Sequence, residues 1–244
     1  MAKHSKKSPG TALITGGSQR IGQAIALALA HKGYKIALHY NGSREAAQQL
    51  AEKIRKTQAA CDIFPADLSD QNDTLSLIAS VHKRFPDLNL LINNASIFKA
   101  SKLSTQDLAQ LEEHWTINLK APYILICEFA RVCKTGGIIN MLDTHIIKNK
   151  TEHLAYLLSK KSLADLTQMA ALSLAPQIRV NGIAPGAILP PANKSSSYLD
   201  RLAQKVPLKR KGDPSYITRS IEFLLDNDYM TGQILWNDGG EHLL

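Results

Sequence analysis

The spacing of apolar residues along the chain switches repeatedly between two patterns. Short apolar or alternating runs are typical of β-strands, and longer stretches with apolar residues every three or four positions are typical of amphipathic helices. The strand pattern occurs in residues 11–15, 35–40, 61–65, 88–93, 137–142, 179–183 and 233–237. The helix pattern occurs in residues 21–31, 44–56, 70–85, 105–132, 155–174 and 214–225. Strand and helix are therefore expected to alternate along the chain.

This alternation predicts an α/β fold, a doubly wound seven-stranded parallel sheet (Rossmann fold) with right-handed crossovers and helices on both faces. Residues 88–93 are almost wholly apolar, which is typical of a central parallel strand that is buried on both faces. Gly33 is expected to end the first helix as its C′ residue. Ser104 and Asp107 are spaced as a capping pair for the helix over residues 105–132.

No shift in composition marks a domain boundary. We therefore expect a basic N-terminal tail, residues 1–10, followed by a single domain, residues 11–244. Residues 187–206 lack clear periodicity and follow a strand end, where open parallel sheets bind ligands. This segment is a candidate substrate lid.

Composition limits the class of protein. With 44% hydrophobic and 20% charged residues, the chain can build a large core, which excludes a disordered protein. It has no apolar run long enough to cross a bilayer and no secretory signal pattern, so we expect no membrane contact and a cytoplasmic location. The formal charge is +8, but no basic cluster is interleaved with aromatic residues, so we expect an anionic cofactor or substrate and no nucleic acid. The spacing of the Cys and His residues predicts no metal site.

Residues 15–22 read TGGSQRIG and lie between the first expected strand and the first expected helix. Glycines at that position permit a tight turn and close approach to a pyrophosphate, which the helix N-terminus favours electrostatically. Residues 39–44, at the end of the second strand, hold no acidic side chain to bind a ribose 2′-hydroxyl. Arg20, Ser43 and Arg44 offer donors and positive charge instead, which favours NADP(H) over NAD(H).

Tyr156 and Lys160 are four positions apart in an expected helix and project from the same face. A positive charge beside a phenol favours the phenolate, so this spacing predicts a lowered Tyr156 pKa. The pair is a candidate proton donor.

Further motifs follow in order along the chain. They are Thr15-Gly16 with Gly22, Asp67-Leu68, Asn93-Asn94-Ala95-Ser96, Asn118, Tyr156 with Lys160, and Pro185-Gly186. With these motifs, the chain from about residue 12 to residue 240 resembles the short-chain dehydrogenase/reductase family. The resemblance implies that Tyr156 is the acid, that Lys160 binds the nicotinamide ribose, and that Asn118 holds a water in the proton relay. It implies that the cofactor is bound by Gly16, Ser18, Arg20, Ile21, Gly22, Tyr40, Asn41, Ser43, Asp67, Leu68, Asn94, Ala95, Ser96, Tyr156, Lys160, Pro185, Gly186 and Ile188.

Two residues depart from the usual pattern of that family. Arg20 replaces the middle glycine of the phosphate loop, and Asp143 occupies the region where a Ser normally precedes the Tyr. An ionised carboxylate only accepts hydrogen bonds and repels a developing oxyanion, which makes plain ketone reduction less favourable. Together with Phe98 after Asn-Asn-Ala-Ser, these departures are similar to the pteridine reductase branch, which includes bacterial dihydromonapterin reductases.

The similarity to this branch implies an NADPH-dependent reduction of a dihydropterin, such as dihydromonapterin or dihydrobiopterin, or of dihydrofolate to its tetrahydro form. Phe98 would then stack on the pterin ring, opposite the nicotinamide. The implied substrate residues are Arg20, Ser96, Phe98, Asp143 and Tyr156. The sequence leaves two roles open for Asp143: protonation of a ring nitrogen together with Tyr156, or a hydrogen bond to the amino-pyrimidine edge. Gly42 is a departure, since some members of the branch carry Arg there at the 2′-phosphate site.

Two alternatives remain. Thr144 could replace the missing hydroxyl in a reductase of small carbonyl compounds or 3-oxoacyl thioesters. The chain could also be an NADP-binding sensor without turnover. We interpret His145 as a loop residue. The family resemblance further implies a homotetramer formed through the helices that carry Asn118 and Tyr156.

Overall fold

Seven parallel strands form one sheet within the computed structural model, which describes residues 9–105, 107–189 and 196–244. The strands are β1 (Thr11–Ile14), β2 (Lys35–Tyr40), β3 (Cys61–Pro65), β4 (Leu88–Asn93), β5 (Gly136–Met141), β6 (Ile178–Pro185) and β7 (Ile234–Asn237). Their order across the sheet is β3-β2-β1-β4-β5-β6-β7. The direction of winding reverses between β1 and β4, and the predicted doubly wound fold is confirmed.

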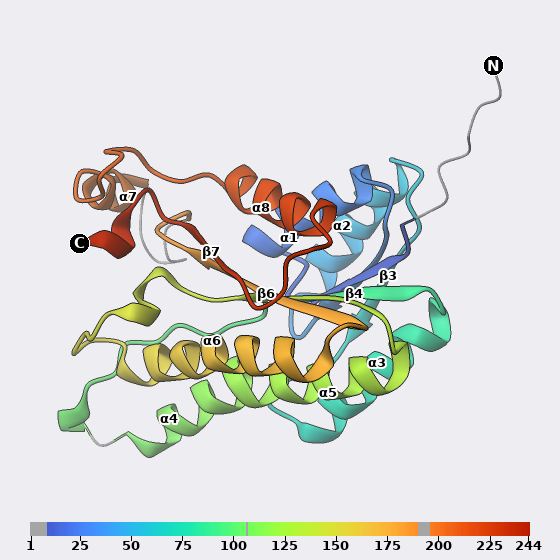
Figure 1. The fold of residues 1–244 in the computed structure, drawn as a ribbon, viewed down its shortest axis with the longest axis horizontal. Coiled ribbons are helices and arrows are strands. Elements are labelled where there is room, and N and C mark those ends of the chain that lie inside the picture. The colour runs from blue at the N-terminus through green and yellow to red at the C-terminus, as the bar shows by residue number, and fades with distance from the viewer. Residues whose placement is uncertain (1–8, 106, 190–195) are drawn as a thin grey trace.

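Helices cover both faces of the sheet (Figure 1). One face carries α1 (Arg20–His31), α2 (Arg44–Arg55) and α8 (Pro214–Asp226). The other carries α3 (Gln71–Arg84), α5 (Ala121–Cys133) and α6 (Leu154–Leu174), with α4 (Leu108–Trp115) packed along α6.

The central strand β4 contributes to the hydrophobic core on both faces. Leu90 and Ile92 pack into the cluster under α1 and α8, whereas Leu88 and Leu91 pack under α3 and α5. Each side chain is at most 3% exposed, and burying one stabilises the fold by about 1.5–3 kcal/mol. The continuous apolar pattern of residues 88–93 is explained by this burial on both faces.

Gly33 ends α1 as predicted. It has a φ of +96°, its N–H donates to the carbonyl of Ala30, and the N–H of Tyr34 donates to the carbonyl of Leu29. This pair of hydrogen bonds is a Schellman motif, which requires a left-handed residue at C′.

The helix predicted over residues 105–132 is wrong in detail. A short 3₁₀ turn (Leu103–Thr105) precedes α4, and a π-helix (Thr116–Lys120) separates α4 from α5. The side chain of Asp107 caps α4 by accepting from the N–H of Gln110. Single-turn π-helices occur frequently at functional sites, and this one contains Asn118.

The candidate lid, residues 187–206, lies partly outside the described residues, which omit 190–195. Where it is described, it contains α7 (Ser196–Ala203), which the sequence pattern did not predict. The basic tail is outside the described residues up to residue 8. In the described parts of the chain, no helix is long and apolar enough to span a membrane.

Candidate active site

The turns after β1 and β4 are joined where the sheet changes its winding direction. Thr15 Oγ1 accepts hydrogen bonds from the backbone N–H groups of Asn94 and Ala95, at 2.9 and 3.0 Å. The Asn94 side chain donates to the carbonyls of Thr15 and Gly16, at 2.9 and 3.1 Å. A Cβ added to Gly22 would lie 2.2 Å from the Gly16 carbonyl oxygen. The two loops therefore fit closely only with glycine at the start of α1.

His39 fixes the phosphate loop from the neighbouring strand, and sequence reasoning missed it. Its Nδ1 accepts from the N–H of Gly16 at 3.0 Å, and its Nε2 lies 3.0 Å from the carbonyl of Ala66. Because Nδ1 accepts, Nε2 carries the proton and donates. Burial lowers the pKa of His39, which favours this neutral form. Both of its partners are backbone groups, so no side-chain motif could have pointed to it.

A cleft of about 410 Å³ opens above these loops. It is lined by Gly16, Ser18, Gln19, Arg20, Ile21, Gly22, His39, Asn41, Ser43, Asp67, Leu68, Asn94, Ala95, Ser96, Ile97 and Ile117. Most of the residues predicted to bind the cofactor therefore lie together. Gln19, His39, Ile97 and Ile117 were not predicted. The N-terminus of α1 faces this cleft, and such an end favours phosphate.

Six residues predicted to bind the cofactor are not part of this cleft's lining, and two of them, Tyr156 and Lys160, belong to the group beyond β5 that is described below. Tyr40, the last residue of β2, is buried in the protein and does not reach the cleft. Pro185 ends β6 and Gly186 follows it, against the backbone of Asp238. Ile188 is buried in the wall of a separate cavity.

Polar groups line the end of the cleft beside β2. The hydroxyls of Ser18 and Ser43 are hydrogen-bonded at 2.7 Å. The lining contains one acidic residue, Asp67, which follows β3 rather than β2. Two hydrogen bonds from Ser69, one from its hydroxyl and one from its N–H, lower the Asp67 pKa and hold it ionised. Its carboxylate is thereby turned to its own loop.

Tyr156 and Asp143 meet beyond the end of β5. The Tyr156 hydroxyl donates to Asp143 Oδ2 at 2.8 Å. Lys160 lies one helical turn after Tyr156, with its ammonium 5.9 Å from the Tyr156 ring centre, and it donates to the carbonyl of Met141 at 2.8 Å. The structure thus brings the predicted acid, carboxylate and lysine together.

The predicted lowering of the Tyr156 pKa is wrong. Burial raises this pKa well above its usual value, and the charge of Asp143 raises it further. Burial also lowers the pKa of Lys160 to about 8, against the opposing effect of Asp143. The spacing of Tyr156 and Lys160 took account of the lysine charge but not of the Asp143 carboxylate. This carboxylate accepts a hydrogen bond from the phenol O–H and so stabilises the neutral phenol.

Asp143 is held by residues on both sides. Its Oδ1 accepts from the N–H of His145 at 2.7 Å and lies 2.8 Å from the His145 ring Nδ1. Burial favours the protonated carboxyl, but the bonds and charge of His145 and the bond from Tyr156 outweigh it and lower the Asp143 pKa. Asp143 is therefore ionised at neutral pH.

Asn118 crosslinks the loop after β4 to helix α6. Its side-chain oxygen accepts from the Ile97 N–H at 2.9 Å and from the Ser96 hydroxyl at 3.1 Å. Its side-chain nitrogen donates to the Ile97 carbonyl and to Ser159 Oγ, both at 3.1 Å. The buried side chain is thus hydrogen-bonded within the protein, and its predicted role in holding a water stays a prediction.

Phe98 presents an aromatic ring beside Tyr156. Phe98 is 52% exposed as a residue, and its ring stacks on the His153 ring at 4.1 Å and meets the Tyr156 ring edge-on at 4.7 Å. The predicted stacking residue therefore lies next to the predicted acid, and part of its surface is open to a ligand.

Thr144 points away from this group. Its buried hydroxyl donates to the carboxylate of Asp238. The structure therefore does not bring Thr144 into the position of a hydroxyl that assists Tyr156.

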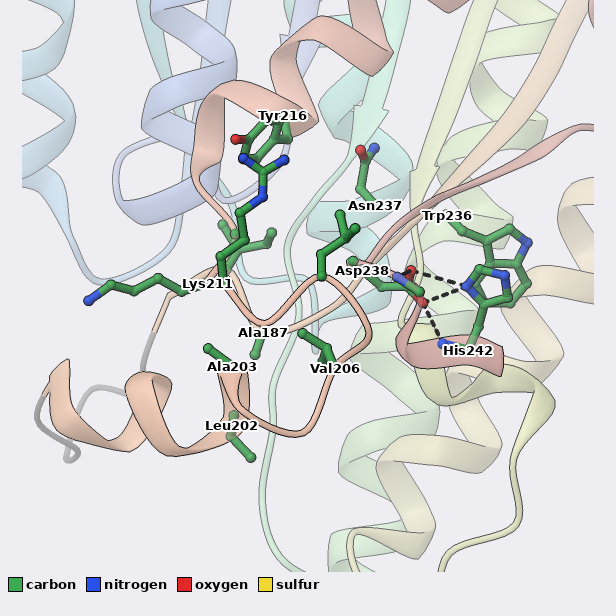
Figure 2. A pocket seen from close by; sticks show the side chains of 16 residues that line it. Ala187, Leu202, Ala203, Val206, Lys211, Tyr216, Trp236, Asn237, Asp238 and His242 are labelled. Carbon is green, nitrogen blue, oxygen red and sulfur yellow. Dashed lines mark hydrogen bonds and ion pairs between the residues drawn. The ribbon is translucent and has the colours of Figure 1, made fainter. Parts of the chain in front are cut away.

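A second cavity, of about 300 Å³, lies between α7, the start of α8 and the segment after β7 (Figure 2). Its walls include Ile188, Val206 and Trp236, and the ring of His242 stacks on Trp236 at 4.8 Å. Among the described residues, no group of His, Cys, Asp and Glu is arranged to hold a metal ion.

Residues 16–242 match a family model described as enoyl-(acyl carrier protein) reductase. The chain belongs to the short-chain dehydrogenase/reductase family. It is 30% identical over 241 residues to the 3-oxoacyl-(acyl-carrier-protein) reductase FabG of Staphylococcus epidermidis, with 96% of this chain and 99% of that protein covered. It is 29% identical over 243 residues to the dihydromonapterin reductase of Citrobacter koseri, with 98% and 99% covered.

A solved structure of the family is also similar. It is FolM alternative dihydrofolate reductase 1 from Brucella canis, complexed with NADP. The two chains are 33% identical with a TM-score of 0.91, and the match covers 97% of this chain and 96% of the other. The predicted family resemblance is confirmed.

Proposed function

We propose that this short-chain dehydrogenase/reductase is an NADPH-dependent pteridine reductase that converts a dihydropterin or dihydrofolate to its tetrahydro form. The observation that carries the proposal is the hydrogen bond from Tyr156 to an ionised Asp143. The names of the dihydromonapterin reductase from Citrobacter koseri and of the Brucella dihydrofolate reductase support the same substrate class.

NADP(H) is the cofactor that the cleft fits best. Gly16 and Gly22 leave room for a pyrophosphate against the N-terminus of α1, and a Cβ at Gly22 would close that space. The hydroxyls of Ser18 and Ser43 and the Arg20 side chain offer donors to a 2′-phosphate, and residues 39–44 contain no carboxylate to repel it. The NADP bound to the Brucella relative supports this assignment. The cofactor supplies the hydride.

The residues around Tyr156 would orient the substrate and supply its proton. Phe98 offers a flat face on which a pterin ring can stack. Lys160 would bind the nicotinamide ribose. A C=N reduction needs a proton on nitrogen. The Tyr156–Asp143 couple holds such a proton in the hydrogen bond between the Tyr156 hydroxyl and Asp143 Oδ2, whose oxygens are 2.8 Å apart.

A 3-oxoacyl reductase is the second candidate, favoured by the likeness to FabG. Such a reaction develops negative charge on the carbonyl oxygen, which needs donors and is repelled by a carboxylate. Asp143 is ionised, and the nearest hydroxyl in sequence, that of Thr144, donates to Asp238. These two observations favour the pteridine reaction. A sensor without turnover is disfavoured because the Tyr156–Asp143 couple is assembled beside Lys160.

We also propose a homotetramer. Exposed apolar side chains lie on the helices through which the family is expected to assemble: Tyr123 on α5, and Leu158, Met169 and Leu172 on α6. Clusters of exposed large apolar residues mark protein interfaces. Three free cysteines and a reaction that consumes NADPH support a cytoplasmic location.

Purified protein is to be incubated with NADPH and, separately, with dihydromonapterin, dihydrobiopterin, dihydrofolate and an acetoacetyl thioester. We expect NADPH oxidation with at least one pterin or folate and little with the thioester. No oxidation with any of the three pterin or folate substrates would exclude the proposed function, and selective oxidation with the thioester would establish the alternative. Tight NADPH binding without turnover on the whole panel would establish the sensor.

A further inference from the structure

A continuous chain of four polar side chains leads from Tyr156 to the C-terminal turn. Tyr156 donates to Asp143 Oδ2 at 2.8 Å, and Asp143 Oδ1 lies 2.8 Å from His145 Nδ1. On the other side of the imidazole, His145 Nε2 lies 3.0 Å from Glu241 Oε1. Each link is within hydrogen-bond distance, so the chain connects the candidate acid to a residue 96 positions beyond His145 in the sequence.

The two segments that form this chain are fixed to each other at further points. His145 lies in a 3₁₀ turn (Thr144–Ile147) after β5, and Glu241 begins the 3₁₀ turn Glu241–Leu243 after β7. Lys148 donates to the main-chain carbonyl of Glu241, and Thr144 donates to Asp238. These bonds fix the two turns to each other, so the His145 imidazole is held between the carboxylates of Asp143 and Glu241.

The imidazole of His145 faces more negative than positive charge. Burial lowers its pKa, but hydrogen bonds to Asp143 and Glu241 and the Asp143 charge outweigh this and raise the pKa to about 9. Lys150 opposes the rise. His145 is therefore an imidazolium at neutral pH, and both of its ring N–H groups donate. Its side chain is 24% exposed, so it can exchange protons with solvent.

We propose that His145 is a positioning residue that stores the proton used at the candidate active site and passes it to Tyr156 through Asp143. The proposal rests on the proposed function. When the substrate nitrogen takes the Tyr156 proton, the His145 Nδ1–H bond breaks and an O–H bond forms on Asp143. That O–H lies on Oδ1, which faces His145, whereas Tyr156 faces Oδ2, so the protonated carboxyl turns about its Cβ–Cγ bond, its O–H bond breaks, and the Tyr156 oxygen takes the proton. His145 becomes neutral, keeps its Nε2–H bond to Glu241, and regains a proton from water.

Two variants separate proton supply from the holding of Asp143. In H145N, the amide can still donate to Asp143, and so can the backbone N–H of residue 145, but the amide stores no proton. E241Q keeps the size of the side chain and removes one of the two carboxylates. H242N is the matched control, because His242 lies in the same C-terminal turn and binds Asp238, without a link to Asp143 (Figure 2).

We expect H145N to lower kcat at least about tenfold with little change in KM or in NADPH binding, since proton transfer by a placed group contributes 10²–10⁴-fold. Wild-type kcat is expected to fall as pH rises past about 9, where His145 loses its proton. In E241Q this fall in kcat should begin at a lower pH, because the carboxylate that helps to raise the His145 pKa is gone. In H145N the fall should be absent. H242N should behave as wild type. An H145N variant with wild-type kcat and pH profile would overturn the proposal.

The titration of His145, followed by nuclear magnetic resonance of labelled imidazole, needs no substrate. We expect a midpoint near pH 9 in the wild-type protein and a lower one in E241Q. A midpoint at or below the ordinary value of about 6.5 would overturn the proton store, whatever the outcome of the substrate panel. Conversely, inactivity of the wild-type protein towards pterins would contradict the proposed function while leaving this titration to decide the protonation of His145.

Discussion

The hydroxyl of Tyr156 and the carboxylate of Asp143 share one hydrogen bond of 2.8 Å, which makes Asp143 the first partner of the phenol. If this couple protonates the substrate, Asp143→Ala should lower kcat by about 100-fold or more, the usual contribution of a placed proton donor. The measurement is steady-state NADPH oxidation with the best pterin. Thr144→Val is the comparison variant, and it should lower kcat far less than Asp143→Ala does, because the Thr144 hydroxyl donates to Asp238 and not to the Tyr156 group. A large loss of kcat in Thr144→Val with little loss in Asp143→Ala would instead support carbonyl reduction.

Gly22 and Gly42 should respond differently to the same added methyl group. A Cβ at Gly22 meets the Gly16 carbonyl oxygen at 2.2 Å, whereas nothing lies within 4 Å of one at Gly42. Gly22→Ala should cost about 1–3 kcal/mol of unfolding free energy through overpacking and weaken NADPH binding. Gly42→Ala should leave both unchanged. Thermal unfolding and cofactor titration test this pair, and equal effects would refute the close packing.

Gly42 also offers a test of cofactor choice. The space around it admits a larger side chain, and its neighbours Asn41 and Ser43 line the cleft. A hydrogen bond to a charged group contributes about 1.5–3 kcal/mol, so Gly42→Arg should raise the preference for NADPH over NADH at least about tenfold. The ratio of the two dissociation constants is the measurement. An unchanged ratio would mean that the 2′-phosphate does not lie beside residue 42.

Phe98 should contribute to substrate binding rather than to folding, because half of its surface is exposed. Loss of aromatic stacking costs about 0.5–1.5 kcal/mol beyond the buried area, so Phe98→Ala should raise the pterin KM by roughly tenfold. The KM for NADPH should not change. Leu108→Ala, a truncation of another exposed apolar side chain, is the control for a general surface effect.

The raised pKa of His145 makes stability depend on pH. A group whose pKa is higher in the folded protein stabilises it fully below the unfolded value, about 6.5, and this stabilisation is lost as pH rises towards about 9. Lys160, with its pKa lowered to about 8, acts in the opposite direction above pH 8. Between pH 6.5 and 8, the free energy of unfolding should therefore fall, by about 1–2 kcal/mol. Urea unfolding at several pH values measures this slope, and Glu241→Gln should flatten it.

Most of the sheet could be predicted because buried parallel strands leave a strong local pattern. The apolar run of β4 and the glycine that ends α1 are examples. Helix α7 was missed because eight residues are too few for a reliable helical period. The π-helix around Asn118 was missed because its apolar spacing continues that of the helices on either side.

The parts of the candidate site that are formed by local sequence motifs could be predicted. The parts that depend on contacts between residues far apart in the sequence could not. Tyr156 and Lys160 are related by helix geometry, and the glycines of the phosphate loop have a fixed spacing. The pKa of Tyr156 was predicted wrongly because it depends on burial and on Asp143, neither of which the helix spacing reports. Glu241 had no local signal, since it meets His145 only after β5 and β7 have joined the same sheet.

Because Glu241 contacts His145, full catalytic activity should require that the last strand of the sheet has folded into place. The strand before Glu241, β7, is one of the two edge strands of the sheet, beside β6, and it is the last of the seven strands in chain order. A molecule with a formed phosphate cleft but an undocked final strand would bind cofactor and still lack the complete chain of side chains to Tyr156. Cofactor binding and catalysis should therefore return at different times during refolding, with catalysis reporting when the last strand has docked.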